Sequence, residues 1–174
     1  MKEPLLISAC LLGRNCKYNG GNNYVPAVEA LKGRYELIPV CPECFGGLPI
    51  PHDPSERVGD RVLSRTGADV TAAFVKGAAR TLETAQKHDA ALALLKERSP
   101  SCGCGTVYDG TFTGTVVPGN GVAAELLLEN GALGAVMSGS GSAVYGLFAD
   151  EERASAAAAA ARELCREVFL TRTA

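Results

Sequence analysis

The chain has almost no net charge of either sign. Its 17 Lys and Arg residues are balanced by 19 Asp and Glu residues, which leaves a net charge of −2 over 174 residues. Proteins that bind nucleic acid through its phosphates need an excess of positive charge on the binding surface. Sequence-independent binding to nucleic acid is therefore disfavoured, and only a local basic patch would support it.

The amino-terminal segment has no long hydrophobic run. The apolar stretch in MKEPLLISACLLGRNC is too short and too soon interrupted for a secretory signal or a membrane span. We therefore expect a cytoplasmic protein without a membrane segment. In a reducing compartment the seven cysteines are not expected to form disulfides, and an odd number cannot all pair within one chain. Metal binding or thiolate chemistry is the better expectation.

Short apolar runs alternate with helical patterns along the first three quarters of the chain. Buried strands are predicted at residues 4–9, 35–40 and 90–95, and helices at residues 27–32, 69–88 and 120–130, the last closed by Gly131. This order predicts an α/β fold with a small, mostly parallel sheet and flanking helices. The segment 46–67, rich in Pro, Gly and charge, is expected to form an ordered loop over the site.

Three cysteines follow the predicted strands. Cys10 and Cys41 come directly after the first two strands, and Cys102 lies in the turn after the third. Open α/β sheets build their sites at the carboxyl ends of strands, so these thiols are expected to lie together. Thiolates are soft ligands for zinc or iron-sulfur clusters.

The spacing alone leaves three interpretations open. Cys41 and Cys44 fit the C-x-x-C pair of a zinc site, whereas Cys102 and Cys104 form a less regular C-x-C pair. Isolated cysteines from three strand ends suit an iron-sulfur cluster at one edge of the sheet. Incidental or buried thiols are the third interpretation.

Five motifs then occur in order along residues 5–131. They are SACLLGRNCKYNGG, CPECFGGLPIPHDPSE, GADVTAAFVKGA, LKERSPSCG and GNGVAAELL. In order and spacing they resemble the thiouracil desulfidase (TudS) family. The resemblance implies a small α/β domain that holds a 4Fe-4S cluster through three cysteines and leaves one iron open. It also implies a hydrolase or lyase that removes sulfur from a thiolated pyrimidine, releasing the oxo-pyrimidine and hydrogen sulfide.

The resemblance also suggests roles for individual residues. It implies that Cys10, Cys41 and Cys102 hold the cluster, with Cys16 as an alternative ligand or a group near the open iron. The remaining thiols, Cys44, Cys104 and Cys165, are interpreted as structural.

Four polar residues near these ligands are given roles in the reaction or in binding the cluster. Glu43, two residues past Cys41, is placed to exchange protons with the pyrimidine ring or with the attacking water. Ser101 and Ser99 could hydrogen-bond the substrate or the cluster sulfurs. Lys96 could offset the negative charge of the cluster.

The chain departs from the family pattern at one loop position. His52 stands in PIPHDPSE where we expect an arginine, so a charge that contacts substrate would become pH-dependent. Arg57 is the residue that could compensate for the missing arginine.

A second departure begins near Ala132. The segment ALGAVMSGSGSAVYGLFADEERA is similar to the carboxyl-terminal end of the galactokinase, homoserine kinase and mevalonate kinase superfamily, and most similar to diphosphocytidyl-methylerythritol kinases. The chain has no G-x-x-x-x-G-K-[ST] loop and lacks the regions that carry the superfamily's catalytic residues, so it is not expected to be a kinase. We therefore predict a desulfidase domain at residues 1–131 and an appendage at residues 132–174.

The appendage is predicted to have a ββαβ order. Its strands are expected at residues 134–137, 143–148 and 168–171, with a helix at residues 150–164. It could pack on the first domain, extend its sheet or pair between chains as an oligomer contact.

The sequence therefore predicts an iron-sulfur enzyme for non-redox desulfuration of thiouracil or a related thiolated pyrimidine. Free base, nucleoside and thiolated tRNA stay open as substrates, and the acidic balance disfavours tRNA. The alternative is a noncatalytic zinc- or cluster-binding module with the tail as an interaction surface.

Overall fold

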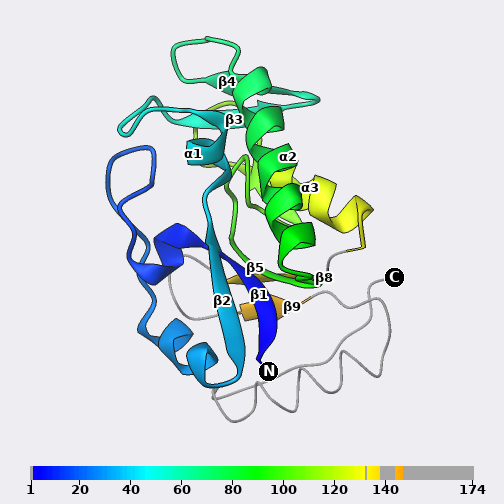
Figure 1. Cartoon of the computed structure of the whole chain (residues 1–174). Coiled ribbons are helices and arrows are strands. Elements are labelled where there is room, and N and C mark those ends of the chain that lie inside the picture. The colour runs from blue at the N-terminus through cyan, green and yellow to red at the C-terminus, as the bar shows by residue number, and fades with distance from the viewer. Residues whose placement is uncertain (1, 132, 138–143, 147–174) are drawn as a thin grey trace.

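A five-stranded sheet forms the centre of the protein (Figure 1). The computed structural model describes residues 2–131, 133–137 and 144–146, and all structural statements concern these residues. The strands lie in the order β2 (Tyr35–Val40), β1 (Glu3–Ser8), β5 (Leu92–Lys96), β8 (Leu133–Met137) and β9 (Val144–Gly146). The first four strands of this order run parallel, and β9 is antiparallel to β8.

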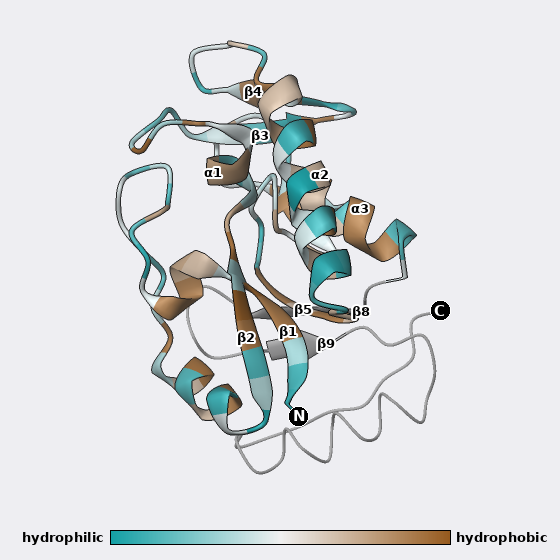
Figure 2. Ribbon diagram, in the orientation of Figure 1, coloured by the Kyte–Doolittle hydropathy of each residue, from teal (hydrophilic) through white to brown (hydrophobic). Residues whose placement is uncertain are grey.

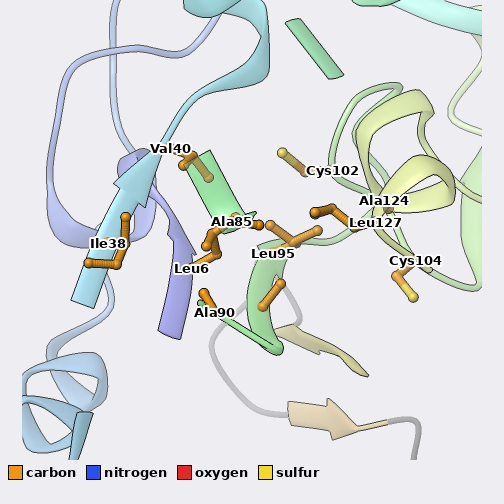
Figure 3. Close-up of a cluster of buried hydrophobic side chains, with 11 residues drawn as sticks. Leu6, Ile38, Val40, Ala85, Ala90, Leu95, Cys102, Cys104, Ala124 and Leu127 are labelled. Atoms are coloured by element: carbon orange, nitrogen blue, oxygen red, sulfur yellow. The ribbon is translucent and has the colours of Figure 1, made fainter. Parts of the chain in front are cut away.

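The central strands are apolar on both faces because helices cover each side. Alternation along β1 sends Leu6 to one face and Leu5 and Ile7 to the other, and β5 divides Leu95 from Leu94 in the same way. Leu6 and Leu95 pack with the helices α2 (Thr71–Lys87) and α3 (Val122–Glu129), as Figure 3 shows.

The opposite face is covered by two short 3-10 helices, η1 (Ala9–Leu12) and η2 (Pro26–Gly33). Val28 of η2 is fully buried there. Colouring by hydropathy shows apolar residues concentrated on β1 and β2 and polar residues along the outward side of α2 (Figure 2). The sheet edge where the cysteines lie is thus held by packing on both faces.

Two small hairpins were not anticipated. The segment 46–67 was predicted to be an ordered loop, but it contains the antiparallel pair β3 (Ser55–Val58) and β4 (Arg61–Ser64). A second pair, β6 (Thr106–Tyr108) and β7 (Val116–Pro118), follows the Cys102 turn. In Figure 1 the first hairpin lies beyond the carboxyl ends of β1 and β2.

The predicted α/β fold with a mostly parallel sheet is confirmed. Gly131 has a φ of 84° and donates its N–H to Leu128 O at 3.0 Å, the left-handed helix end expected from the sequence. Beyond it, β8 and β9 extend the sheet, and β8 pairs with β5 over five residues. The division at residue 131 stays a prediction, and the predicted tail helix and last strand lie outside the described residues.

Candidate active site: a cleft lined by thiols

The strand ends bring four thiols into one cleft. Cys10 lies in η1 directly after β1, Cys41 joins β2 to the short helix α1 (Pro42–Gly46), and Cys102 lies in the turn after β5. Because β1 pairs with both β2 and β5, these three strand ends are neighbours. Together with Cys16 they line a cleft of about 550 Å³. The gathering of these cysteines at one edge of the sheet follows from the parallel topology.

The Cys16 thiol lies between two of the predicted ligands. Its hydrogen bond to the Cys10 sulfur, and a second to Cys41, hold the pKa of Cys16 far above its ordinary range. The same contacts lower the pKa of Cys10 and of Cys41, against the effect of burial. Asn23 Nδ2 also donates to Cys10 Sγ at 3.5 Å. Cys10 and Cys41 are therefore biased toward the thiolate, which is the form that binds metals.

Cys102 has a different environment. Its side chain is buried, and burial raises its pKa. The ammonium of Lys96 lines the same cleft and donates to the Glu97 carbonyl oxygen at 2.8 Å. Burial lowers the pKa of Lys96, so its positive charge lies in a poorly hydrated place near the thiols. A bound anionic group would offset the unfavourable free energy of placing the Lys96 charge away from water.

The donor set fits an iron-sulfur cluster. Cys10, Cys41 and Cys102 are soft sulfur donors on three separate segments, and two of them are biased toward thiolate. Within the part of the chain that the structure describes, no three His, Cys, Asp or Glu side chains are close enough together to hold one metal ion. The thiols surround a cleft with room for a group larger than one ion.

The Glu43 carboxylate reaches the same cleft and has two partners. Ser99 Oγ donates to Glu43 Oε1 at 3.5 Å, and His52 Nε2 lies 3.2 Å from Glu43 Oε2. The other imidazole nitrogen of His52, Nδ1, is 2.7 Å from the Pro49 carbonyl oxygen. The hydrogen bond to Glu43 raises the pKa of His52, because a charged imidazole can donate to both partners.

This pairing explains the loop position where an arginine was expected. His52 lines the cleft and, when protonated, supplies a cation to Glu43, so a positive charge is present at this position in a pH-dependent form. Arg57 does not compensate for it. Its guanidinium binds Glu125 Oε2 at 2.7 Å and the Asn120 carbonyl oxygen at 2.6 Å, and it is not among the residues that line the cleft.

Ser101 lies behind the wall of the cleft. The residue is only 1% exposed and is not among the cleft-lining residues, although its neighbours Pro100 and Cys102 are. Its Oγ has no hydrogen-bond partner among the described residues. A buried hydroxyl without a partner carries an uncompensated desolvation cost.

The remaining described cysteines do not line the cleft, although Cys44 hydrogen-bonds to Cys41. Burial raises the pKa of Cys44 to about 12 and also raises that of Cys104. Cys104 packs with Ala124 and Leu127 of α3, and its sulfur points away from Cys102 in Figure 3. Neither residue lines the cleft. Cys165 lies outside the described residues.

Several cleft residues were missed by sequence reasoning. Asn23 ends the YNGGNN run that begins two residues after Cys16, and polar residues in such a turn are a usable signal. Arg65 and Phe112 come from the two unanticipated hairpins, so nothing in the spacing connected them with the cysteines. Their position depends on long-range packing of the hairpins over the sheet edge.

The fold and the cleft define an α/β protein with a thiol-lined cleft at the carboxyl edge of its sheet. The profile of the 2-thiouracil desulfurase family matches residues 5–138. The chain belongs to this family.

Two relatives match most of the chain. The uncharacterized protein YbbK of Bacillus subtilis (strain 168) is 37% identical over 137 residues, which is 73% of this chain and 91% of that protein. The solved structure of a [4Fe-4S]-dependent thiouracil desulfidase, TudS, is 41% identical and superposes with a TM-score of 0.72. That match covers 79% of this chain and 91% of the solved chain.

The last part of the chain has a second likeness. The carboxyl-terminal profile of the GHMP kinases matches residues 112–167. A 4-diphosphocytidyl-2-C-methyl-D-erythritol kinase of Desulfitobacterium hafniense (strain Y51) is 53% identical over 49 residues, which is 28% of this chain but only 17% of the kinase. The resemblance expected for the tail is thereby confirmed.

Among the helices in the described part of the chain, none has the length and apolar character needed to cross a membrane.

Proposed function

We propose that residues Cys10, Cys41 and Cys102 hold a 4Fe-4S cluster with which this protein converts thiouracil and water into uracil and hydrogen sulfide. The observation that carries the proposal is the convergence of these three thiols with the Glu43 carboxylate in one cleft. The TudS structure is that of a [4Fe-4S]-dependent thiouracil desulfidase, and the present chain is 41% identical to it in sequence over the matched part. When bound, the cluster supplies an open iron that acts as a Lewis acid toward the thiocarbonyl sulfur.

Cys16 was the alternative ligand expected from the sequence, and this proposal gives it a different role. It contacts two of the three ligands through its thiol and keeps its proton because its pKa is raised. We assign it a place beside the ligands, where it hydrogen-bonds to their sulfurs. Lys96 places a positive charge in the same cleft and so favours an anionic cluster there.

Glu43 carries the proton in the proposed reaction. As the C–O bond forms, its carboxylate accepts one proton from the attacking water and returns it to the sulfur. When the C–S bond breaks, the second water proton, left on the new hydroxyl group, follows through the same carboxylate, so that the carbonyl forms and the sulfur leaves as hydrogen sulfide. The reaction is thereby balanced without an oxidant or a reductant. His52 on Oε2 and Ser99 on Oε1 hold the carboxylate in place, so the acid-base group is oriented before substrate arrives.

Ser101 contributes a hydrogen bond in this proposal. Its unpartnered hydroxyl lies next to Cys102 along the chain, and a bound cluster sulfur or the substrate would give it the partner that it lacks. Ser99 has a separate task. Its Oγ accepts from the backbone N–H groups of Ser101 and Cys102 at 3.1 and 3.2 Å, which fixes the turn that carries both.

Three finer assignments belong to the same proposal. The substrate is a free thiolated pyrimidine, since the net charge of −2 gives little attraction for tRNA. The reaction is a hydrolysis in the cytoplasm, where thiols stay reduced. The tail, which extends the sheet through β8 and β9, is the place where a second chain would pair.

The ligand assignment is tested by single replacements with serine. Purified without oxygen, the wild type should be brown and contain iron and sulfide. Each of Cys10→Ser, Cys41→Ser and Cys102→Ser should lose most of its iron, because a site with three protein ligands has no spare donor. Cys104→Ser is the matched control and should keep its iron. A colourless wild type with one tightly held zinc would instead support the noncatalytic module.

The role of Glu43 is tested separately from cluster binding. Glu43→Gln keeps the shape of the side chain but cannot accept the proton, so turnover of 2-thiouracil should fall by roughly 100-fold or more. Its visible absorption spectrum should match that of the wild type. Glu129→Gln, on an exposed residue outside the cleft, is the control. Turnover near the wild-type value in Glu43→Gln would remove Glu43 from the mechanism.

A further inference from the structure

An aromatic and cationic pair lines the cleft together with the thiols. Arg65 follows β4, and Phe112 lies in the turn between β6 and β7. The guanidinium carbon of Arg65 lies over the Phe112 ring, 5.7 Å from its centroid. Both side chains line the cleft that contains Cys10, Cys41 and Cys102, although they come from hairpins outside the main sheet.

Phe112 is not placed there by core packing. The residue is half-buried and belongs to neither of the two buried hydrophobic clusters of the described chain. Its backbone has a φ of 57°, a left-handed conformation that is unfavourable for a bulky side chain. A strained aromatic residue outside the core, at the wall of a cleft, indicates a role in that cleft.

A buried carboxylate holds Phe112 in this conformation. Glu56 in β3 is 8% exposed, and its Oε2 accepts the backbone N–H groups of Gly110 and Phe112, each at 2.9 Å. Asp109 Oδ1 closes the same turn by accepting from Thr111 N at 3.0 Å. The two hairpins are therefore joined by charge-assisted hydrogen bonds that end at Phe112.

The chemistry of this pair matches a flat heterocycle. A pyrimidine has an extended π-face and polar groups only at its edge, and such rings are recognised by stacking on aromatic side chains or guanidinium planes. The guanidinium also has N–H donors for a ring carbonyl oxygen. The thiols and Glu43 act at the thiocarbonyl carbon and its sulfur, and they provide no surface for the rest of the ring.

We propose that Phe112, together with Arg65, is the stacking surface that binds the pyrimidine ring, and that Glu56 is the positioning residue that holds Phe112 in place. This inference rests on the proposed function, because it assumes a thiolated pyrimidine as the substrate. Phe112 contacts the ring plane, and Arg65 donates to the ring oxygen. Neither residue contacts the cluster or transfers a proton.

The test separates substrate binding from catalysis. Phe112→Leu keeps an apolar side chain of similar size but has no π-face, so it should raise the KM for 2-thiouracil by about 5-fold or more with kcat within 2-fold. Phe112→Tyr should restore the wild-type KM. Tyr24→Leu removes an exposed aromatic residue that does not line the cleft, and it should change neither constant.

A binding measurement accompanies the kinetics. The Glu43→Gln holoprotein turns over slowly enough for calorimetry with 2-thiouracil, and adding Phe112→Leu to it should weaken the Kd by the same factor. Iron content and circular dichroism confirm that each variant is loaded and folded. The assignment of Phe112 would be overturned if Phe112→Leu had a KM within 2-fold of the wild type and the double variant had a Kd within 2-fold of Glu43→Gln.

Glu56 is tested by its coupling to Phe112. Glu56→Gln loses the charged acceptor and should raise KM while leaving kcat and iron content near the wild type. If Glu56 acts only through Phe112, the double variant should be no worse than Phe112→Leu alone, and additive losses would overturn the positioning role. A wild type that does not convert 2-thiouracil would refute the proposed function itself, whereas normal conversion with unchanged KM in Phe112→Leu refutes only this inference.

Discussion

The position of Glu43 depends on a close crossing of α1 and α2, and Gly77→Ala tests it. A methyl group added at Gly77 would lie 1.9 Å from the Pro42 carbonyl oxygen and 2.7 Å from its carbon. Both obstructing atoms belong to the backbone of α1, between Cys41 and Glu43. Gly46 makes the reciprocal approach, since a methyl group there would lie 2.1 Å from the Ala73 carbonyl oxygen. The two helices can cross at this distance only because both contact positions are glycine.

The magnitude follows from two opposing effects. Alanine is favoured over glycine inside a helix by about 1 kcal/mol. Real Cβ contacts essentially never fall below 3.0 Å, so the two backbones would have to separate by about 1 Å. Overpacking of this kind costs up to about 3 kcal/mol when no flexible side chain can yield. The net loss should be about 2 kcal/mol, which for a chain of this size lowers Tm by about 4–8 °C.

The same displacement of α1 should also lower the activity of the enzyme. Because α1 carries Glu43 and begins directly after Cys41, a shift of about 1 Å should lower turnover by roughly 10-fold to 100-fold. Gly33→Ala is the matched control, since no atom lies within 4 Å of a methyl group there and its Tm should not fall. Thermal unfolding of the holoprotein, iron content and steady-state turnover are measured on both variants. A Gly77→Ala protein as stable and as active as the wild type would refute the close crossing.

Two further predictions concern pH and the tail. Charged His52 pairs with Glu43, so its contribution is complete below the ordinary histidine pKa of about 6.5 and is lost as the pH rises through the raised pKa of the folded state. His52→Gln should therefore lower Tm at pH 6 more than at pH 9, and an equal effect at both would contradict the pairing. A chain that ends at Met137 keeps the pairing of β8 with β5, so it should retain iron and activity. A chain that ends at Gly131 exposes the edge of β5, so it should have a lower Tm and be less soluble. Equal stability of the two truncations would show that β8 contributes nothing to the fold.

Much of the main sheet could be predicted because its signals are local. Each of the strands β1, β2 and β5 contains a short apolar run, and the helix α2 repeats its apolar residues at the helical period. The hairpins β3–β4 and β6–β7 are short and partly exposed, so they lack such a run. Their strands have only three or four residues each, and cross-strand pairing rather than composition defines them.

Some residues of the candidate site could likewise be predicted from local sequence signals, and others could not. Cysteines directly after apolar strands are visible in the sequence, and parallel topology alone brings Cys10, Cys41 and Cys102 to one edge. The pairing of His52 with Glu43 depends on how the loop after α1 folds back, which no spacing rule gives. Ser101 was expected to hydrogen-bond the substrate or the cluster sulfurs, and this stays a prediction. Its buried position reflects the packing of α3, whose first residues donate to the Ser101 carbonyl oxygen.

The cleft residues come from two parts of the fold, the sheet edge and the small hairpins, and we expect the two parts to have different functions. The thiols and Glu43 belong to the sheet edge and to α1, which are fixed by packing on both faces of the sheet and by the crossing at Gly77. Arg65 and Phe112 belong to small hairpins that are joined to each other through Glu56 and contribute no side chain to the two buried clusters. If the proposed roles hold, sequence changes in the hairpins should alter which ring is bound while the proposed ligands Cys10, Cys41 and Cys102 stay in place. Changes at the sheet edge cannot be separated in this way, because the proposed ligand Cys41 and the proposed proton carrier Glu43 are two positions apart, on the short helix α1 and the turn before it.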